Sequence, residues 1–135
     1  MQLTQHTDYG LRLLIVLTRM GGGPIALPEF AAEQRLSYNH VAKVAQTLVR
    51  EGFIASRRGR NGGVGLARAP EDITVGEVVR VLERGMQLAD CAGCALMGDC
   101  NTSPLLAEAL AAFLAVLDRT TLAEAAKRRV PGLAA

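Results

Sequence analysis

The chain has 135 residues, of which 50% are hydrophobic and only 4% aromatic, and its formal net charge is +2. This length suits one domain with at most a small appendage, and a core of Leu, Val and Ala favours packed helices over a β-sandwich. The apolar runs are too short for a membrane span, and the N-terminus lacks the basic and apolar segments of a signal peptide. We therefore expect a cytoplasmic protein that makes no contact with a membrane.

A first helix is expected to begin at Thr7, which can cap it, with Asp8 in the first turn, where a carboxylate suits the helix dipole. Residues 11 and 13–17 are apolar nearly all round, so most of this helix should be buried. The run Gly-Gly-Gly-Pro at 21–24 ends it.

A short helix over about 28–35 and a turn at Leu36 lead into a third helix, for which Ser37 is the expected N-cap. Helical spacing gives this third helix an apolar face made of Val41, Val44, Ala45, Leu48 and Val49. Its other face is polar, and Gly52 lies just past its C-terminal end.

Two short aliphatic segments, 53–57 and 64–68, flank a turn rich in Gly and Arg. The dipeptide Asn61-Gly62 is a strong hairpin signal, so the two segments should pair as a β-ribbon. Thr74 and Glu77 form a capping-box pattern that begins a helix ending near Leu82.

Residues 90–101 form an expected loop, and a long helix should follow with Ser103 as its N-cap and Pro104 at its first position. Thr121 and Glu124 repeat the capping-box pattern and indicate a terminal helix. The fold class is therefore mainly α: a winged helix-turn-helix with a two-stranded β wing and a long C-terminal helix. The domains are 1–84 for DNA binding, 85–102 for a cysteine loop, and 103–135 for the long helix and tail.

Helix, tight turn, helix and basic hairpin, in this order, predict a DNA-binding regulator and not an enzyme. Alone, the helix could be an ordinary amphipathic helix and the hairpin a charged surface turn; their combination favours DNA. Residues at the start of the third helix should reach base edges, and Lys43 and Arg50 should reach phosphates. The candidate DNA-binding residues are Ser37, Tyr38, Asn39, His40, Lys43 and Arg50 on the helix, and Arg57, Arg58, Arg60 and Asn61 on the wing.

All three cysteines fall within ten residues, as Cys91, Cys94 and Cys100. In a reducing compartment such a cluster is more typical of a metal site than of a disulfide, and soft thiolates select zinc or iron–sulfur clusters. Both usually take four ligands, so a carboxylate, His6 or a small molecule would complete the set. An iron with a weak oxygen ligand is the easiest for a gas or oxidant to attack, which favours a sensor.

Two other interpretations of the cysteines are a structural zinc site and a thiol redox enzyme that uses Cys91 and Cys94. The redox motif needs a strand before it and a helix that starts at it, whereas here a helix precedes and a loop follows.

The chain also resembles the NsrR-like nitric-oxide-sensing repressors, which belong with the IscR- and RirA-like iron–sulfur winged-helix regulators. The similarity runs from Met1 to about Ala125, and its motifs are Met1–Thr4, Thr7–Arg12, Ser37–Lys43, Arg58–Leu66 and Ile73–Val79.

This resemblance implies a homodimer crossed by its long C-terminal helices, so that 103–135 is a dimerisation helix and tail. Each subunit would hold a [4Fe-4S] cluster through Cys91, Cys94 and Cys100, with Asp8 of the partner subunit as the fourth ligand. The loaded protein would bind double-stranded operator DNA and repress genes of nitric oxide detoxification. Nitric oxide would nitrosylate the cluster and release the DNA.

Two related subtypes define the alternatives. IscR-like regulators hold a [2Fe-2S] cluster with a His three positions past the last Cys, where this chain has Ser103. RirA-like regulators share the cysteine triplet, so an iron- or redox-responsive regulator is the alternative function. The gap between Cys91 and Cys94 is shorter than in NsrR-like proteins, which keeps [2Fe-2S] as the alternative cluster.

Overall fold

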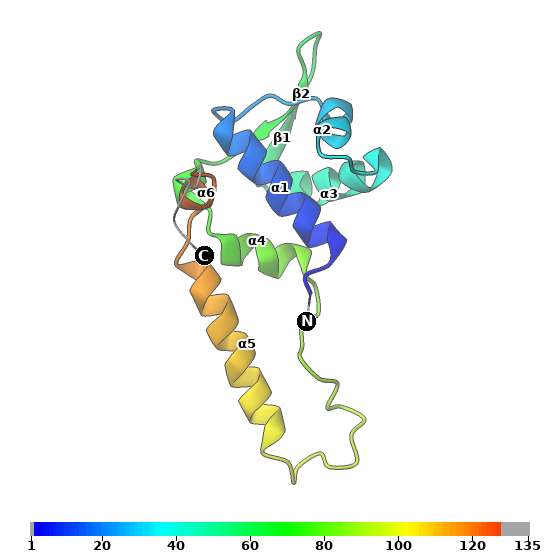
Figure 1. Ribbon diagram of the computed structural model, residues 1–135, viewed down its shortest axis with the longest axis vertical. Coiled ribbons are helices and arrows are strands. Elements are labelled where there is room, and N and C mark those ends of the chain that lie inside the picture. Colours follow the sequence, from blue (N-terminus) through cyan, green and yellow to red (C-terminus); the bar gives the residue numbers. More distant parts are fainter. Residues whose placement is uncertain (1, 128–135) are drawn as a thin grey trace.

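The computed structural model describes residues 2–127 (Figure 1). Its helices are α1 (Gln5–Arg19), α2 (Leu27–Glu33), α3 (Tyr38–Arg50), α4 (Val75–Leu82), α5 (Thr102–Asp118) and α6 (Leu122–Ala125). Strands β1 (Ile54–Arg57) and β2 (Gly63–Leu66) form the sheet, and a 3-10 turn η1 (Pro70–Asp72) precedes α4. This mainly helical architecture with one small sheet confirms the predicted fold class.

The core lies where α1 packs against α3 and α4. Leu13, Leu14 and Leu17 of α1 are fully buried, as the apolar run in the sequence predicted. The helices approach closely at Gly10, because a Cβ atom there would lie 3.3 Å from Val44 of α3 and would overlap Leu82 of α4. Phe30 and Phe53 close the same core from α2 and from the segment before β1.

The wing is an antiparallel hairpin in which Ile54 pairs with Leu66 and Arg57 pairs with Gly63. Residues 58–62 form its tip, and Asn61-Gly62 lies at the end of this loop. Within this loop, the Gly62 N–H donates to the Gly59 carbonyl at 3.0 Å. The base of the wing is attached to the loop after α1 by a β-bridge between Ile25 and Val64.

Two helix starts differ from the sequence prediction. The N-cap of α1 is Thr4, whose hydroxyl accepts from the Thr7 N–H at 3.4 Å, while Thr7 itself lies inside the helix and is fully buried. Helix α5 begins one residue before Ser103, with Asn101 as its N-cap. In both cases the helix begins closer to the N-terminus than the capping residue predicted from the sequence.

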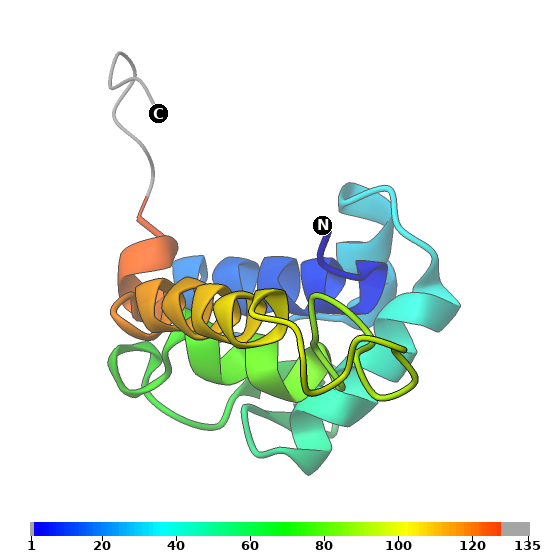
Figure 2. The same ribbon diagram turned by 90° about the horizontal axis from the view of Figure 1, so that it is seen from below.

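Helix α5 extends away from the body formed by α1–α4, on the side opposite to the wing tip (Figure 1). It contacts α4, yet none of its residues is buried. Seen from below, α5 and the loop before it lie together in front of this body (Figure 2). The predicted capping box at Thr121 and Glu124 is confirmed at the start of α6, which buries Leu122 in the core. Among residues 2–127 no helix is long and apolar enough to cross a membrane.

Candidate DNA-binding surface and cysteine loop

Helix α3 has the two faces that a recognition helix needs. Val41, Val44 and Leu48 are buried against the core, which fixes the helix on the body. Val49, which the spacing assigned to this apolar face, is 39% exposed. Ser37, Asn39 and Lys43 are exposed, and Tyr38 is 50% exposed, so the start of the helix presents polar groups to solvent.

His40 differs from its neighbours because it is half-buried against α1. Its ring lies 4.8 Å, between centroids, from the ring of Tyr9 and 6.2 Å from that of His6. This contact ties the beginning of the recognition helix to α1, so the His40 side chain packs between elements as well as lying on the candidate surface.

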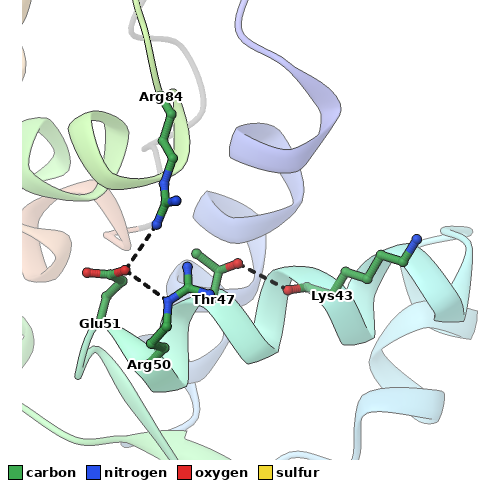
Figure 3. Close-up of polar contacts among 5 residues, drawn as sticks. All are labelled: Lys43, Thr47, Arg50, Glu51 and Arg84. Atoms are coloured by element: carbon green, nitrogen blue, oxygen red, sulfur yellow. Dashed lines mark hydrogen bonds and ion pairs between the residues drawn. The ribbon is translucent and has the colours of Figure 1, made fainter.

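The C-terminal end of α3 carries a small ion-pair cluster (Figure 3). The same Glu51 carboxylate oxygen accepts from Arg50 Nε at 3.2 Å and from Arg84 at 3.3 Å. Arg84 follows the end of α4, so this cluster joins α3 to the segment that leads into the cysteine loop. The contact between Glu51 and Arg84 was not predicted from the sequence, because 33 residues separate the two partners.

The basic residues of the wing are all exposed. Arg57 ends β1, and Arg58, Arg60 and Asn61 lie in the tip loop, which projects beyond the body (Figure 1). Guanidinium groups on a narrow projection suit contacts with a phosphate backbone or a minor groove. The structure thus presents the wing residues and the polar face of α3 to solvent, as a winged helix requires.

The three cysteines lie in the long loop between α4 and α5, and all are free thiols. Cys94 is exposed, and Cys91 and Cys100 are half-buried. Local turns shape this loop: the Cys94 N–H donates to the Cys91 carbonyl at 3.2 Å and the Met97 N–H donates to the Cys94 carbonyl at 3.1 Å. Within residues 2–127 no three His, Cys, Asp or Glu side chains are gathered as a metal site.

The donor set nevertheless fits a soft metal centre. Thiolates are the ligands that zinc and iron–sulfur clusters select, and Cys91 and Cys94 are already joined by one tight turn. The backbone N–H of Thr102, followed by its hydroxyl and the N–H of Ser103, lowers the pKa of the Cys100 thiol. These donors favour the thiolate, which is the form that ligates metal.

Asp8 lies in the first part of α1 and faces solvent, with its side chain 44% exposed. It pairs with Arg12 one helical turn later, through contacts of 2.8 and 3.1 Å. Asp8 is therefore accessible from solvent, and its partner within the chain is a cation.

Glu83 is a residue that the sequence analysis missed. This C-cap of α4 accepts hydrogen bonds from the Thr4 N–H and hydroxyl, both at 3.0 Å, and from the buried Thr7 hydroxyl. Burial alone would raise the pKa of Glu83, but the hydrogen bonds from Thr7 and Thr4 outweigh it and lower the pKa. A charged carboxylate thus fastens the start of α1 to the end of α4.

Comparison with known proteins identifies the family to which this chain belongs. The family model for Rrf2, described as an iron-dependent transcriptional regulator, matches residues 3–128. The chain belongs to the Rrf2 family. Members of this family are transcription regulators and not enzymes, so the winged helix is a DNA-binding unit.

Similarity to individual members is substantial. The chain is 41% identical, over 128 residues, to the HTH-type transcriptional regulator NsrR of Shouchella clausii, covering 90% of this chain and 86% of that protein. It is similar to the structure of CymR, the global cysteine regulator of B. subtilis, with a TM-score of 0.78, 29% identity and coverage of 93% and 96%. The structure of IscR from T. potens gives a TM-score of 0.75, 29% identity and coverage of 93% and 85%.

Proposed function

We propose that this chain is a repressor that binds operator DNA as a homodimer, carries an iron–sulfur cluster and releases the DNA in response to nitric oxide. Cys91, Cys94 and Cys100 would hold a [4Fe-4S] cluster, and Asp8 of the partner subunit would be its fourth ligand. When bound, the cluster supplies the iron atoms with which nitric oxide reacts.

The three free thiols carry this proposal. They share one loop, and the hydrogen bonds described within it join residues that are close in the sequence. The loop can therefore bring the thiols together without disturbing the core. The loop also directly follows α4, which packs against α1. A change at the cysteines therefore reaches the DNA-binding unit through a short path.

The exposed helix α5 supports the homodimer. It presents Leu105 and Val116, which are 62% and 53% exposed, and it has no buried residue of its own. Large exposed apolar side chains on one element are typical of an interface. A second copy of α5 is the partner that a symmetric dimer supplies.

On the DNA side, Lys43, Arg50 and the wing arginines would hold phosphates, and Tyr38, Asn39 and their neighbours would face base edges. Two recognition helices that read successive major grooves must be separated by about 34–36 Å. With Asp8 bound across the dimer, α1 of one subunit would be fixed to the cysteine loop of the other, which sets this separation. Without that bond α1 would not be fixed to the cysteine loop of the partner subunit, and the separation would be free to drift.

Electrophoretic binding of oxygen-free protein to candidate promoters, with and without nitric oxide, tests this proposal. We expect visible iron–sulfur absorption, tight binding, and loss of binding when nitric oxide is added. Cys94→Ala should lose the absorption and the response, whereas Arg60→Ala should bind DNA less tightly and keep the absorption.

Colourless protein with bound zinc would contradict the proposal and favour a structural metal site. Intact absorption with DNA binding that follows iron supply or redox state, and ignores nitric oxide, would favour the RirA- or IscR-like alternative. Asp8→Ala should keep a weaker cluster with an altered response; an unchanged spectrum and response would exclude Asp8 as the ligand.

A further inference from the structure

Two consecutive residues, Glu83 and Arg84, stand where the DNA-binding unit meets the cysteine loop. Glu83 caps α4, and Gly85, which follows with a φ of +71°, turns the chain into the loop. Cys91 comes six residues later. A displacement at the N-terminal end of the loop therefore meets this dipeptide before it reaches α4 along the chain.

The two side chains reach different elements. Glu83 accepts from Thr4 and Thr7 at the start of α1, directly beside Asp8. Arg84 donates to Glu51 at the end of α3, and Glu51 also holds Arg50 (Figure 3). One dipeptide thus connects the base of the cysteine loop with the N-terminus of α1 and with the C-terminus of the recognition helix.

The two contacts differ in strength. Thr7 is fully buried and its hydroxyl donates to Glu83, so the loss of Glu83 would leave this hydroxyl only its 3.2 Å contact with the Thr4 hydroxyl. The Arg84 side chain is 69% exposed, and its pair with Glu51 is a surface ion pair that contributes little by itself. Glu83 is therefore the stronger connection and Arg84 the weaker one.

We propose that Glu83 and Arg84 are positioning residues that couple the state of the cysteine loop to the orientation of α1 and α3, and hence to DNA affinity. This inference rests on the proposed function and names the residues by which that site is regulated. When the loop is held by its ligands, the dipeptide keeps the start of α1, and Asp8 with it, in the orientation that suits the dimer. When the loop relaxes, the same contacts transmit the change to the end of the recognition helix.

The test compares operator affinity of the loaded and the cluster-free homodimer, because their ratio measures coupling and a merely structural residue would not change it selectively. Couplings of this kind are typically about 5–150-fold. We expect Glu83→Ala to assemble the cluster with unchanged absorption and to lower this ratio at least about fivefold. Glu83→Gln should restore much of the ratio, because its amide carbonyl can still accept from Thr4 and Thr7.

Arg84→Ala should also lower the ratio, but by a smaller factor than Glu83→Ala does. Arg84→Lys should restore the ratio in part. Glu77→Ala is the matched control, because it removes another carboxylate of α4 that pairs with Arg68 and touches neither α1 nor α3 in the contacts described. Its ratio should equal that of the wild type.

A second readout needs no cluster. In the cluster-free protein, Glu83→Ala should speed amide hydrogen exchange at Thr7 and Asp8, whose N–H groups donate to Thr4, while Glu77→Ala should leave it unchanged. Local opening is the expected result when a helix start loses its anchor.

The outcomes separate the two proposals. A wild-type ratio near one, or wild-type protein without iron, overturns the proposed function and the coupling role with it. A normal wild-type ratio that Glu83→Ala leaves unchanged overturns the coupling role alone. Should Glu83→Ala fail to fold, Arg84→Ala and Arg84→Lys decide: an unchanged ratio in both rejects the coupling and a graded loss supports it.

Discussion

Arg35 holds a backbone conformation that is usually left to glycine. Its φ is +56°, and it follows α2 at the turn of the helix-turn-helix. The N–H of Leu36 donates to the Ala31 carbonyl at 2.8 Å and the N–H of Arg35 to the Ala32 carbonyl at 3.1 Å, which is the Schellman pattern. The sequence predicted that α2 reaches Arg35, whereas this turn ends it at Glu33.

Replacing this residue should stabilise the fold. A left-handed conformation costs a non-glycine residue about 1–2 kcal/mol, and glycine loses about 0.5–1 kcal/mol more entropy on folding. Arg35→Gly should therefore raise the free energy of unfolding by about 0.5–1 kcal/mol and the Tm by about 2–4 °C in thermal unfolding. Arg35→Ala is the control, since it removes the same side chain but keeps the strain. Equal stability of the two variants would mean that the conformation carries no penalty here.

At the scale of elements, periodicity and turn chemistry predicted the helices and the wing, because these patterns are local. They predicted the boundaries less well. Thr4 and Thr7 are both of a residue type that caps helices. The Thr7 hydroxyl donates to Glu83, which is distant in the sequence, and Thr7 therefore lies buried inside the helix. The cysteines and the exposed arginines could be found from the sequence by residue type and spacing. The contact of Glu51 with Arg84 and the contacts of Glu83 and His40 could not, because these partners come from other parts of the chain.

The junction of α4 and α5 is another contact that only the fold creates. Gly76 of α4 lies so close to Asp118 that an added Cβ atom would overlap its carboxylate and would lie 2.9 Å from its backbone N. Arg80, one turn further along α4, holds the same carboxylate with two hydrogen bonds, one of them at 2.7 Å. This pair fixes the end of α5 on the body.

This junction should make stability depend on pH. The hydrogen bond from Arg80 lowers the pKa of Asp118 below its ordinary value of 3.8. A carboxyl whose pKa is lower in the folded state stabilises the fold above its unfolded pKa and loses this contribution as the pH falls through the folded value. Wild type should therefore have a higher Tm than Asp118→Asn at pH 7, and the difference should shrink below about pH 4. In an Arg80→Gln background the difference should be small at every pH; a persistent dependence would assign it to another group.

At the scale of the whole molecule, helix α5 offers the face by which two copies of this chain would join in the proposed homodimer. Helix α5 carries an exposed stripe whose members are spaced by four, three and four residues: Leu105, Ala109, Ala112 and Val116. Apolar residues at this spacing lie on one face of a helix, and the two alanines in the middle let a second helix approach closely. The stripe is therefore the face on which we expect the dimer to close.

Charge placed on this stripe should separate the subunits. A two-fold interface contains every residue twice, so Leu105→Asp combined with Val116→Asp would bury four carboxylates between the helices. Burial of an unpaired charge costs several kcal/mol, which exceeds the roughly 1.5–3 kcal/mol that each large apolar side chain contributes. Sedimentation at micromolar concentration should show a monomer that keeps its helical circular dichroism and binds operator DNA weakly, because one recognition helix then acts alone. Ala111→Asp is the control, because it places the new charge on the side of α5 that already carries Glu108. This variant should remain a dimer. If the double variant also remains a dimer with wild-type DNA affinity, the subunits meet through another surface and α5 does not set the spacing of the recognition helices.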